Sequence, residues 1–218
     1  MINHYAVQKA LRVKLLTLSV CTTGSVQLSA TASGYERLTG SFLVDGFTPG
    51  MEVTGVGFSA SGNNAAQTIT SVSALAIACP GCSTEAAGTR TLTVGLPAKR
   101  AWENVELEPV TGSPYVEETY LPGPMEAITL GASAQLEVLP LYVPKIYVPA
   151  GSGVGAARSY ADAILELFAP RTSLTVSGHT VTVRTVPSPY SGQLLQAGPG
   201  WGVVPITIPL RVRTANSI

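Results

Sequence analysis

Residues 141–170 read LYVPKIYVPAGSGVGAARSYADAILELFAP, an apolar extended run that passes through a glycine-rich loop into a helical pattern. The β-branched and aromatic residues before Pro149 predict a strand. Over residues 155–168 the apolar positions recur at helical spacing, and Pro170 ends the pattern because proline cannot continue a helix. The expected apolar face comprises Ala157, Tyr160, Ala161, Ile164, Leu167 and Phe168. The stretch therefore predicts a strand, a loop and a helix in succession.

A second helix is predicted over residues 3–18. Its apolar side chains are spaced so that they share one face, and Asn3 is suited to cap its first turn. These side chains are Val7, Leu11, Leu15 and Leu18. We expect this face and that of residues 155–168 to pack on a sheet, burying Leu11, Leu15, Ile164 and Phe168.

The composition changes over residues 20–98, where Ser, Thr, Gly and Ala are frequent and β-branched residues occur in short runs. This composition is typical of small antiparallel strands joined by tight turns. Asp45-Gly46 and Pro49-Gly50 are turn signals, and residues 61–78 indicate a loop followed by two strands. The stretch predicts a compact β module.

Further strands are predicted beyond residue 98. Extended segments flank the turn at Thr111-Gly112 and suggest a strand pair, and two more strands are expected at about 126–130 and 136–148. Pro140, Pro144 and Pro149 would confine the last of these to an edge or bulged position. The chain then ends in a hairpin around Ser177-Gly178 and a strand with outward-facing Arg211 and Arg213.

The sequence therefore predicts an α+β fold, with an antiparallel or mixed sheet and two helices packed on one face. Residues 1–19 and 99–218 would form this core. Residues 20–98 would form an inserted all-β module, since loop-closure entropy grows slowly with the length of an insertion.

Composition limits the classes of function. The chain has 218 residues, of which 45% are hydrophobic and 12% are charged, so we expect a partner to cover part of its surface. Its 13 basic and 13 acidic residues cancel, which argues against direct binding of nucleic acid or acidic lipid. Lys9, Arg12 and Lys14 interrupt the first apolar run, and no stretch approaches the roughly 20 apolar residues of a membrane span. We therefore expect a soluble protein made in the cytoplasm, without membrane contact.

Cys79-Pro80-Gly81-Cys82 has the spacing of half a zinc site or of a redox dithiol. A structural zinc needs four ligands, and a redox pair normally opens a helix, whereas this motif follows an apolar strand. We therefore interpret it as a β-turn without a metal. A disulfide formed on oxidation stays a second possibility.

Other catalytic motifs are weak. We interpret His179 as a solvated turn residue, and neither it nor His4 has a nucleophile motif beside it. The carboxylates between residues 103 and 118 alternate with apolar residues, which predicts a solvated sheet face. These carboxylates are Glu103, Glu106, Glu108, Glu117 and Glu118. Residues 151–157, GSGVGAA, lack the spacing of a phosphate-binding loop and are interpreted as a flexible loop with a helix start. We expect no enzyme, no cofactor and no metal.

The expected core resembles the tail terminator proteins of long-tailed bacteriophages, a family that includes the lambda-like terminators. The resemblance rests on the first helix and on RAWENVELEP, PYVEETYLP, residues 141–170 and GPGWGVVPITIPLRVRT. Trp102, Glu103, Asn104 and the helix of residues 156–168 match best. It covers residues 1–18 and 99–218, and the simplest members lack residues 20–98.

The resemblance implies a virion protein at the head-proximal end of the tail. Such a protein forms a homohexameric ring on the last ring of the tail tube, stops tube polymerisation and presents a surface to the head connector. Its expected partners are copies of itself, the tail tube protein and head-tail connector proteins.

If the chain closes such a ring, loops short on charge and rich in Gly or Pro are the candidate contacts. Three segments meet this description: residues 121–125, 149–154 and 193–201. The candidate interface residues are Leu121, Pro122, Gly123, Pro124, Met125, Pro149, Gly151, Gly153, Gln193 and Trp201.

Three other hypotheses remain, of which the first belongs to the same assembly class. A head-completion or tail-tube subunit would also form rings. A carbohydrate- or cell-binding protein would use the β module, and a glycan array would test it. An enzyme is disfavoured because no catalytic constellation is found.

Overall fold

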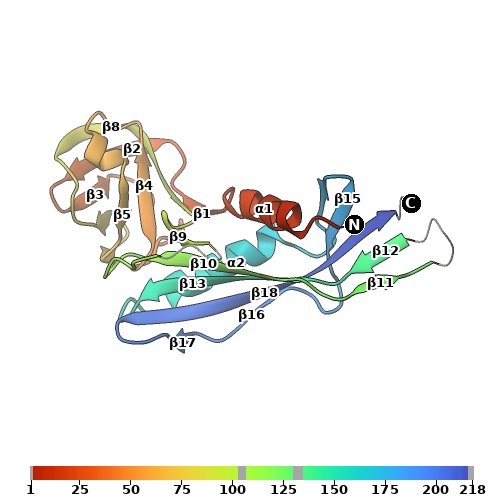
Figure 1. The fold of residues 1–218 in the computed structure, drawn as a ribbon. Coiled ribbons are helices and arrows are strands. Elements are labelled where there is room, and N and C mark those ends of the chain that lie inside the picture. Colours follow the sequence, from red (N-terminus) through yellow and green to blue (C-terminus); the bar gives the residue numbers. More distant parts are fainter. Residues whose placement is uncertain (1, 103–106, 130–134, 216–218) are drawn as a thin grey trace.

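The computed structural model describes residues 2–102, 107–129 and 135–215. Within these residues, two helices lie beside two β-sheets that use separate stretches of chain. Figure 1 shows the first sheet at one end of the molecule and the second sheet running beneath both helices. This content is consistent with the predicted α+β class.

Helix α1 (His4–Leu15) begins as predicted. The side chain of Asn3 accepts a hydrogen bond of 3.0 Å from the backbone N–H of Ala6, which caps the first turn. Val7, Leu11 and Leu15 are buried along one face. The helix ends at Leu15 rather than at Leu18, and Leu18 is buried just beyond its end.

Helix α2 (Gly155–Leu167) matches the second predicted helix. Its C-terminal residue is followed by Phe168, whose N–H still bonds to the carbonyl of Ile164 at 3.0 Å. Phe168 and Ile164 are fully buried, as are Leu11 and Leu15 of the first helix. The predicted burial of these four side chains is confirmed.

The first sheet has eight strands, all paired antiparallel. The strands are β1 (Ser19–Thr22), β2 (Val26–Thr31), β3 (Gly34–Arg37), β4 (Glu52–Val56), β5 (Ala66–Thr68), β6 (Ser71–Val72), β7 (Ala76–Ala78) and β8 (Glu85–Gly95). A short 3-10 helix, η1 (Ser61–Asn64), precedes β5. The 11-residue β8 organises the sheet because it pairs with β1, β2 and β4.

The second sheet has ten strands. They are β9 (Lys99–Ala101), β10 (Tyr115–Leu121), β11 (Met125–Ala127), β12 (Gln135–Val138), β13 (Leu141–Pro149), β14 (Ser173–Val176), β15 (His179–Val183), β16 (Tyr190–Ser191), β17 (Leu195–Gln196) and β18 (Trp201–Ala215). The 15-residue β18 pairs with five of them: β12, β13, β15, β16 and β17. The predicted strand pair around residues 111–112 is present as β9 and β10, and these two strands run parallel.

The proline-bearing strand was expected at an edge or a bulged position, and the edge position is wrong. β13 lies inside the sheet, between β10 on one side and β18 on the other. Pro144 is accommodated because the ladder to β18 has no paired positions at Val143 and Pro144, between Tyr142 and Lys145. A missing N–H donor at this gap therefore breaks no ladder hydrogen bond to β18.

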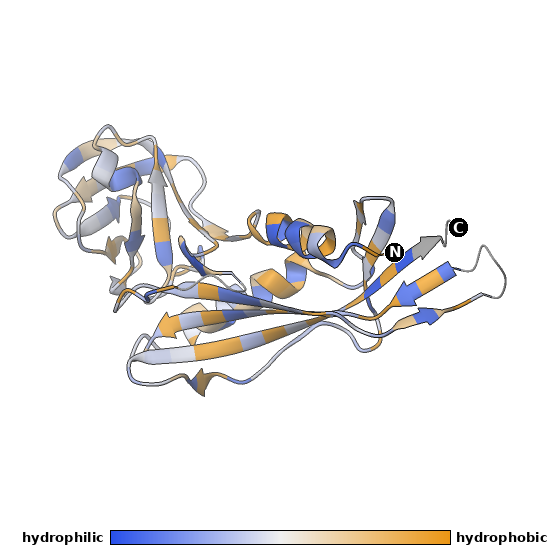
Figure 2. Cartoon of the chain, viewed as in Figure 1, coloured by the Kyte–Doolittle hydropathy of each residue, from blue (hydrophilic) through white to orange (hydrophobic). Residues whose placement is uncertain are grey.

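Burial alternates along the central strands. Every second side chain of β13 is buried. Figure 2 shows hydrophobic residues along much of β13 and β18. Both helices lie over the same side of this sheet in Figure 1, and Phe168 at the end of α2 contacts the ring of Tyr142 with centroids 5.7 Å apart.

The two sheets meet near the start of α2. The backbone N–H of Glu52 in β4 donates to the hydroxyl of buried Tyr160 at 3.1 Å, and Ser19 pairs with Gly95 where the chain enters and leaves the first sheet. One continuous hydrophobic cluster includes residues of both sheets. That residues 20–98 fold independently stays a prediction.

Candidate functional site

The three predicted interface segments lie at two ends of β13. Leu121 pairs with Leu141 at the start of this strand, whereas Trp201 pairs with Pro149 at its end. Eight steps along a strand at about 3.3 Å each separate these ends by about 26 Å. The structure therefore brings residues 149–154 and 193–201 together and leaves residues 121–125 apart.

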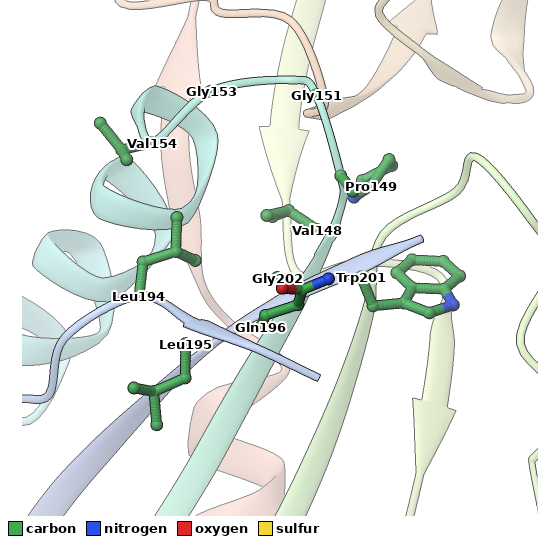
Figure 3. Close-up of a pocket in the computed structure, with 11 residues that line it drawn as sticks. Val148, Pro149, Gly151, Gly153, Val154, Leu194, Leu195, Gln196, Trp201 and Gly202 are labelled. Carbon is green, nitrogen blue, oxygen red and sulfur yellow. The ribbon is translucent and has the colours of Figure 1, made fainter. Parts of the chain in front are cut away.

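The two segments that meet enclose a surface hollow of about 410 Å³ (Figure 3). Its lining is Val148, Pro149, Ala150, Gly151, Gly153, Val154, Leu194, Leu195, Gln196, Trp201 and Gly202. Sequence reasoning missed Val148 and Gly202, which lie just outside the predicted segments. A Cβ at Gly202 would lie 3.0 Å from Leu194 Cδ1, so glycine lets the leucine lie close against β18.

Most of this lining is apolar. Val154 is 57% exposed and Leu195 is 53% exposed, so large apolar side chains border the hollow at the surface. None of the lining residues has an ionisable side chain. The arrangement can bind an apolar group of a partner, and it offers no general acid, base or nucleophile.

Aromatic stacking holds one wall of the hollow. Trp201 meets the ring of Tyr115 edge-on, with centroids 5.0 Å apart, and Tyr115 stacks on Tyr147 at 4.2 Å. The hydroxyl of Tyr147 donates to Glu117 at 2.9 Å, and Lys145 donates to the same carboxylate at 2.6 Å. Burial opposes ionisation of Glu117, but these two hydrogen bonds outweigh it and lower its pKa. Trp201 is thereby positioned by a chain of contacts across β10 and β13.

The third segment is also exposed. Leu121 and Met125 flank the turn between β10 and β11, and both present apolar side chains to solvent. Gly123 approaches the next connection closely, since a Cβ there would lie 2.4 Å from the carbonyl oxygen of Leu139. The turn therefore requires glycine at this position.

The predicted solvated face of carboxylates is wrong for Glu118. This side chain is 1% exposed because alternate residues of β10, from Val116 to Tyr120, face the core. Arg12 of α1 compensates its charge. Glu108 is exposed, while Glu103 and Glu106 lie outside the described residues.

The prediction for His179 is also wrong. It is 8% exposed because it begins β15, in which alternate residues are buried, and its Nδ1 has no hydrogen-bond partner among the described residues. The hairpin around it is confirmed, with Val176 opposite His179 and positive φ at Ser177 and Gly178. His4 contacts the hydroxyl of Tyr120 at 3.0 Å.

The Cys79–Cys82 motif forms the predicted turn, with Pro80 and Gly81 at its centre. The two Sγ atoms are 3.4 Å apart and both cysteines are free and buried. Burial, and then the neighbouring Cys82, raise the pKa of Cys79, which disfavours the reactive thiolate. In the described part of the chain, no group of three or more His, Cys, Asp or Glu side chains could hold a metal ion.

Residues 151–154 form a loop that leads into α2, as expected, and the flexibility of this loop stays a prediction. Gly151 and Gly153 both have positive φ, and Val154 precedes the helix without a side-chain cap. Of the best-matching motif, Trp102 stacks on the Arg12 guanidinium at 4.5 Å, whereas Glu103 and Asn104 lie outside the described residues.

Comparison with known families identifies the class of protein. Residues 84–210, more than half of the chain, match a family model, and the family is one of structural proteins of the phage tail. The chain belongs to the phage tail terminator protein family. The protein is accordingly a virion component, and the resemblance based on sequence is confirmed.

The match begins next to β8, so it includes part of the stretch that the resemblance had left out, and it does not reach α1. No curated protein matches the chain. A solved structure with 23% sequence identity covers 54% of this chain and 79% of its own, at a TM-score of 0.43. No helix in the described residues is long and apolar enough to cross a membrane.

Proposed function

We propose that this protein caps the tail tube as a ring of six copies, stops tube polymerisation and provides the joining surface for the head connector. Family membership supports this proposal and is the observation that carries it. The site geometry fits an assembly role, because its exposed groups are apolar and no catalytic side chain lines it.

The position of the candidate segments suggests how one subunit serves several neighbours. A closed ring is built from heterologous contacts, in which each subunit gives one surface and receives a different one. A terminator must also offer one face to the tube and a different face to the connector. The hollow beside Trp201 and the turn at residues 121–125 lie at opposite ends of β13, which suits two separate partners.

The proposal is tested by adding the purified protein to polymerising tail-tube subunits and measuring tube lengths by negative-stain electron microscopy. We expect shorter tubes with added density at one end, and six copies per ring by native mass spectrometry. Unchanged lengths without capping density would overturn the terminator role and favour a head-completion or tail-tube subunit.

A pair of variants tests the hollow itself. Leu195→Asp places a charge on its apolar rim and should abolish ring formation or capping. Leu38→Asp is the matched control, since Leu38 is 82% exposed in the connection after β3 and does not line the hollow. Equal capping by both variants would exclude the hollow as a contact.

A further inference from the structure

Three arginines surround a second hollow, of about 230 Å³, on the opposite part of the second sheet. Its lining is Arg171, Thr182, Val183, Arg184, Thr185, Val186 and Arg211. Neither the family nor the proposed function assigns a role to it. We infer that it is a binding site for a phosphate-type oxyanion.

Strand register places Arg211 on the outer face of the sheet. Thr182 of β15 lies opposite Arg211 of β18, and Val183 lies opposite Leu210. The side chains of Val183 and Leu210 are buried, so those of Thr182 and Arg211 point away from the core. Arg184 directly follows the last residue of β15 and also lines the hollow.

Backbone hydrogen bonds hold the ends of this cluster. The N–H of Arg184 donates to the carbonyl of Pro209 at 2.9 Å, and the N–H of Arg171 donates to the carbonyl of Val183 at 2.9 Å. Arg171 and Arg184, which flank the β14–β15 hairpin, are thereby brought to one place with Arg211 of β18. Such fixed positions reduce the entropy lost when a ligand binds.

Two guanidinium donors are unsatisfied there. Nε of Arg184 and Nε of Arg211 are both inaccessible to solvent and have no hydrogen-bond partner among the described residues. Nε of Arg211 is 3.1 Å from Glu137, a charge contact without hydrogen-bond alignment, and Glu137 is hydrogen-bonded instead by Arg213 at 2.8 Å. A buried donor without an acceptor is costly, so a bound acceptor would stabilise this arrangement.

Charge also favours an anion. In the described part of the chain, Arg171 and Arg184 form no ion pair, and Glu137 alone balances both Arg211 and Arg213. The local excess of positive charge suits a dianion better than a single carboxylate. Guanidinium groups match the oxygens of phosphate in geometry and donate several hydrogen bonds to them. The phosphate group is either free or part of a larger molecule such as a nucleic acid backbone.

The inference is tested by titrating the full-length protein with inorganic phosphate at constant ionic strength, using isothermal titration calorimetry and the melting temperature. We expect saturable binding and a raised Tm. Arg184→Gln should weaken the affinity at least tenfold. Arg158→Gln, an exposed arginine on α2, is the matched control and should bind as wild type does.

If Arg184→Gln does not fold, Arg171→Gln provides a second test. Arg171 is exposed, so this variant should keep its structure and bind phosphate more weakly. Titration with acetate and with a short DNA duplex separates the sources of the anion. If the duplex binds more tightly than inorganic phosphate and this binding is lost in Arg184→Gln, the ligand is a backbone phosphate. If the duplex binds more weakly than inorganic phosphate, the ligand is free phosphate. Absence of saturable phosphate binding, equal affinity for acetate, or wild-type affinity in both arginine variants would overturn the inference.

Discussion

The hydroxyl of Tyr142 donates a hydrogen bond of 2.8 Å to Oε2 of Glu118. The other oxygen of this carboxylate accepts hydrogen bonds from Arg12 of α1, and the ring of Trp102 covers the Arg12 guanidinium. Burial, and then the charge of Glu118, raise the pKa of Tyr142 well above its ordinary value. One buried carboxylate thus joins α1, β10 and β13.

We predict that Glu118→Gln destabilises the protein by about 2 to 4 kcal/mol, because a buried ion pair is costly to break from one side. This cost is smaller than for a fully buried ion pair, because the Arg12 side chain is partly exposed and can be hydrated once Glu118 is replaced. Glu117→Gln is the control. It changes a half-exposed ion pair on the other face of β10 and should cost about 1 kcal/mol or less. Urea unfolding measures both, and equal losses would contradict the role assigned to Glu118.

Charges placed in the helix–sheet core should be more damaging. Leu15→Asp and Ile164→Asp each bury an unpaired charge at a fully buried position, so we expect a loss of several kcal/mol. Val13→Asp provides the control, since Val13 is exposed on the same helix as Leu15. Thermal melting close to wild type for both core variants would show that the helices are not packed as described.

Deleting residues 20–98 and joining the ends with a short Gly-Ser linker should leave a folded core that still forms rings. The pairing of Ser19 with Gly95 brings the ends of the deleted segment together. Deletion removes the Glu52 N–H that bonds to the hydroxyl of Tyr160, so adding Tyr160→Phe should recover about 1 kcal/mol. Circular dichroism and size-exclusion chromatography are the measurements. Aggregation of both deletion variants would mean that residues 20–98 belong to the main core.

The stability of the first sheet should depend on pH through Glu85. Hydrogen bonds from the backbone N–H groups of Ser59 and Ala60 lower the pKa of this carboxyl. Below the ordinary Glu pKa of about 4.3 the unfolded chain therefore binds a proton that the folded chain does not. Stability is fully present above this pH and is lost as the pH falls through the folded pKa.

In Glu85→Gln the unfolding free energy should accordingly fall less steeply than in wild type as the pH is lowered below 5. At pH 7 this variant should be less stable than wild type. The exposed Glu36→Gln is the control, and it should keep the wild-type slope. Urea unfolding at a series of pH values gives the slopes. Parallel curves for wild type and Glu85→Gln would disprove the assignment.

The candidate site was foreseeable in part. Gly- and Pro-rich composition pointed to residues 149–154 and 193–201, and these two segments meet at the hollow beside Trp201. Nothing in their sequences indicated that they meet, because this depends on the pairing of β13 with β18. The hollow lined by three arginines could not be predicted from the sequence either, since Arg211 was predicted only as an outward-facing residue.

Features that arise within a few residues could be predicted without coordinates. The helix around Leu11 and Leu15, the α2 helix that Pro170 follows, and the hairpin at Ser177-Gly178 depend on side-chain spacing, capping and turn conformation. The burial of Glu118 and His179 and the interior position of β13 depend on which strands pair across long stretches of chain. An alternating strand pattern shows which residues share a face. Whether that face meets solvent or a helix is set by contacts such as Arg12 with Glu118, between residues 106 positions apart, which local chemistry does not encode.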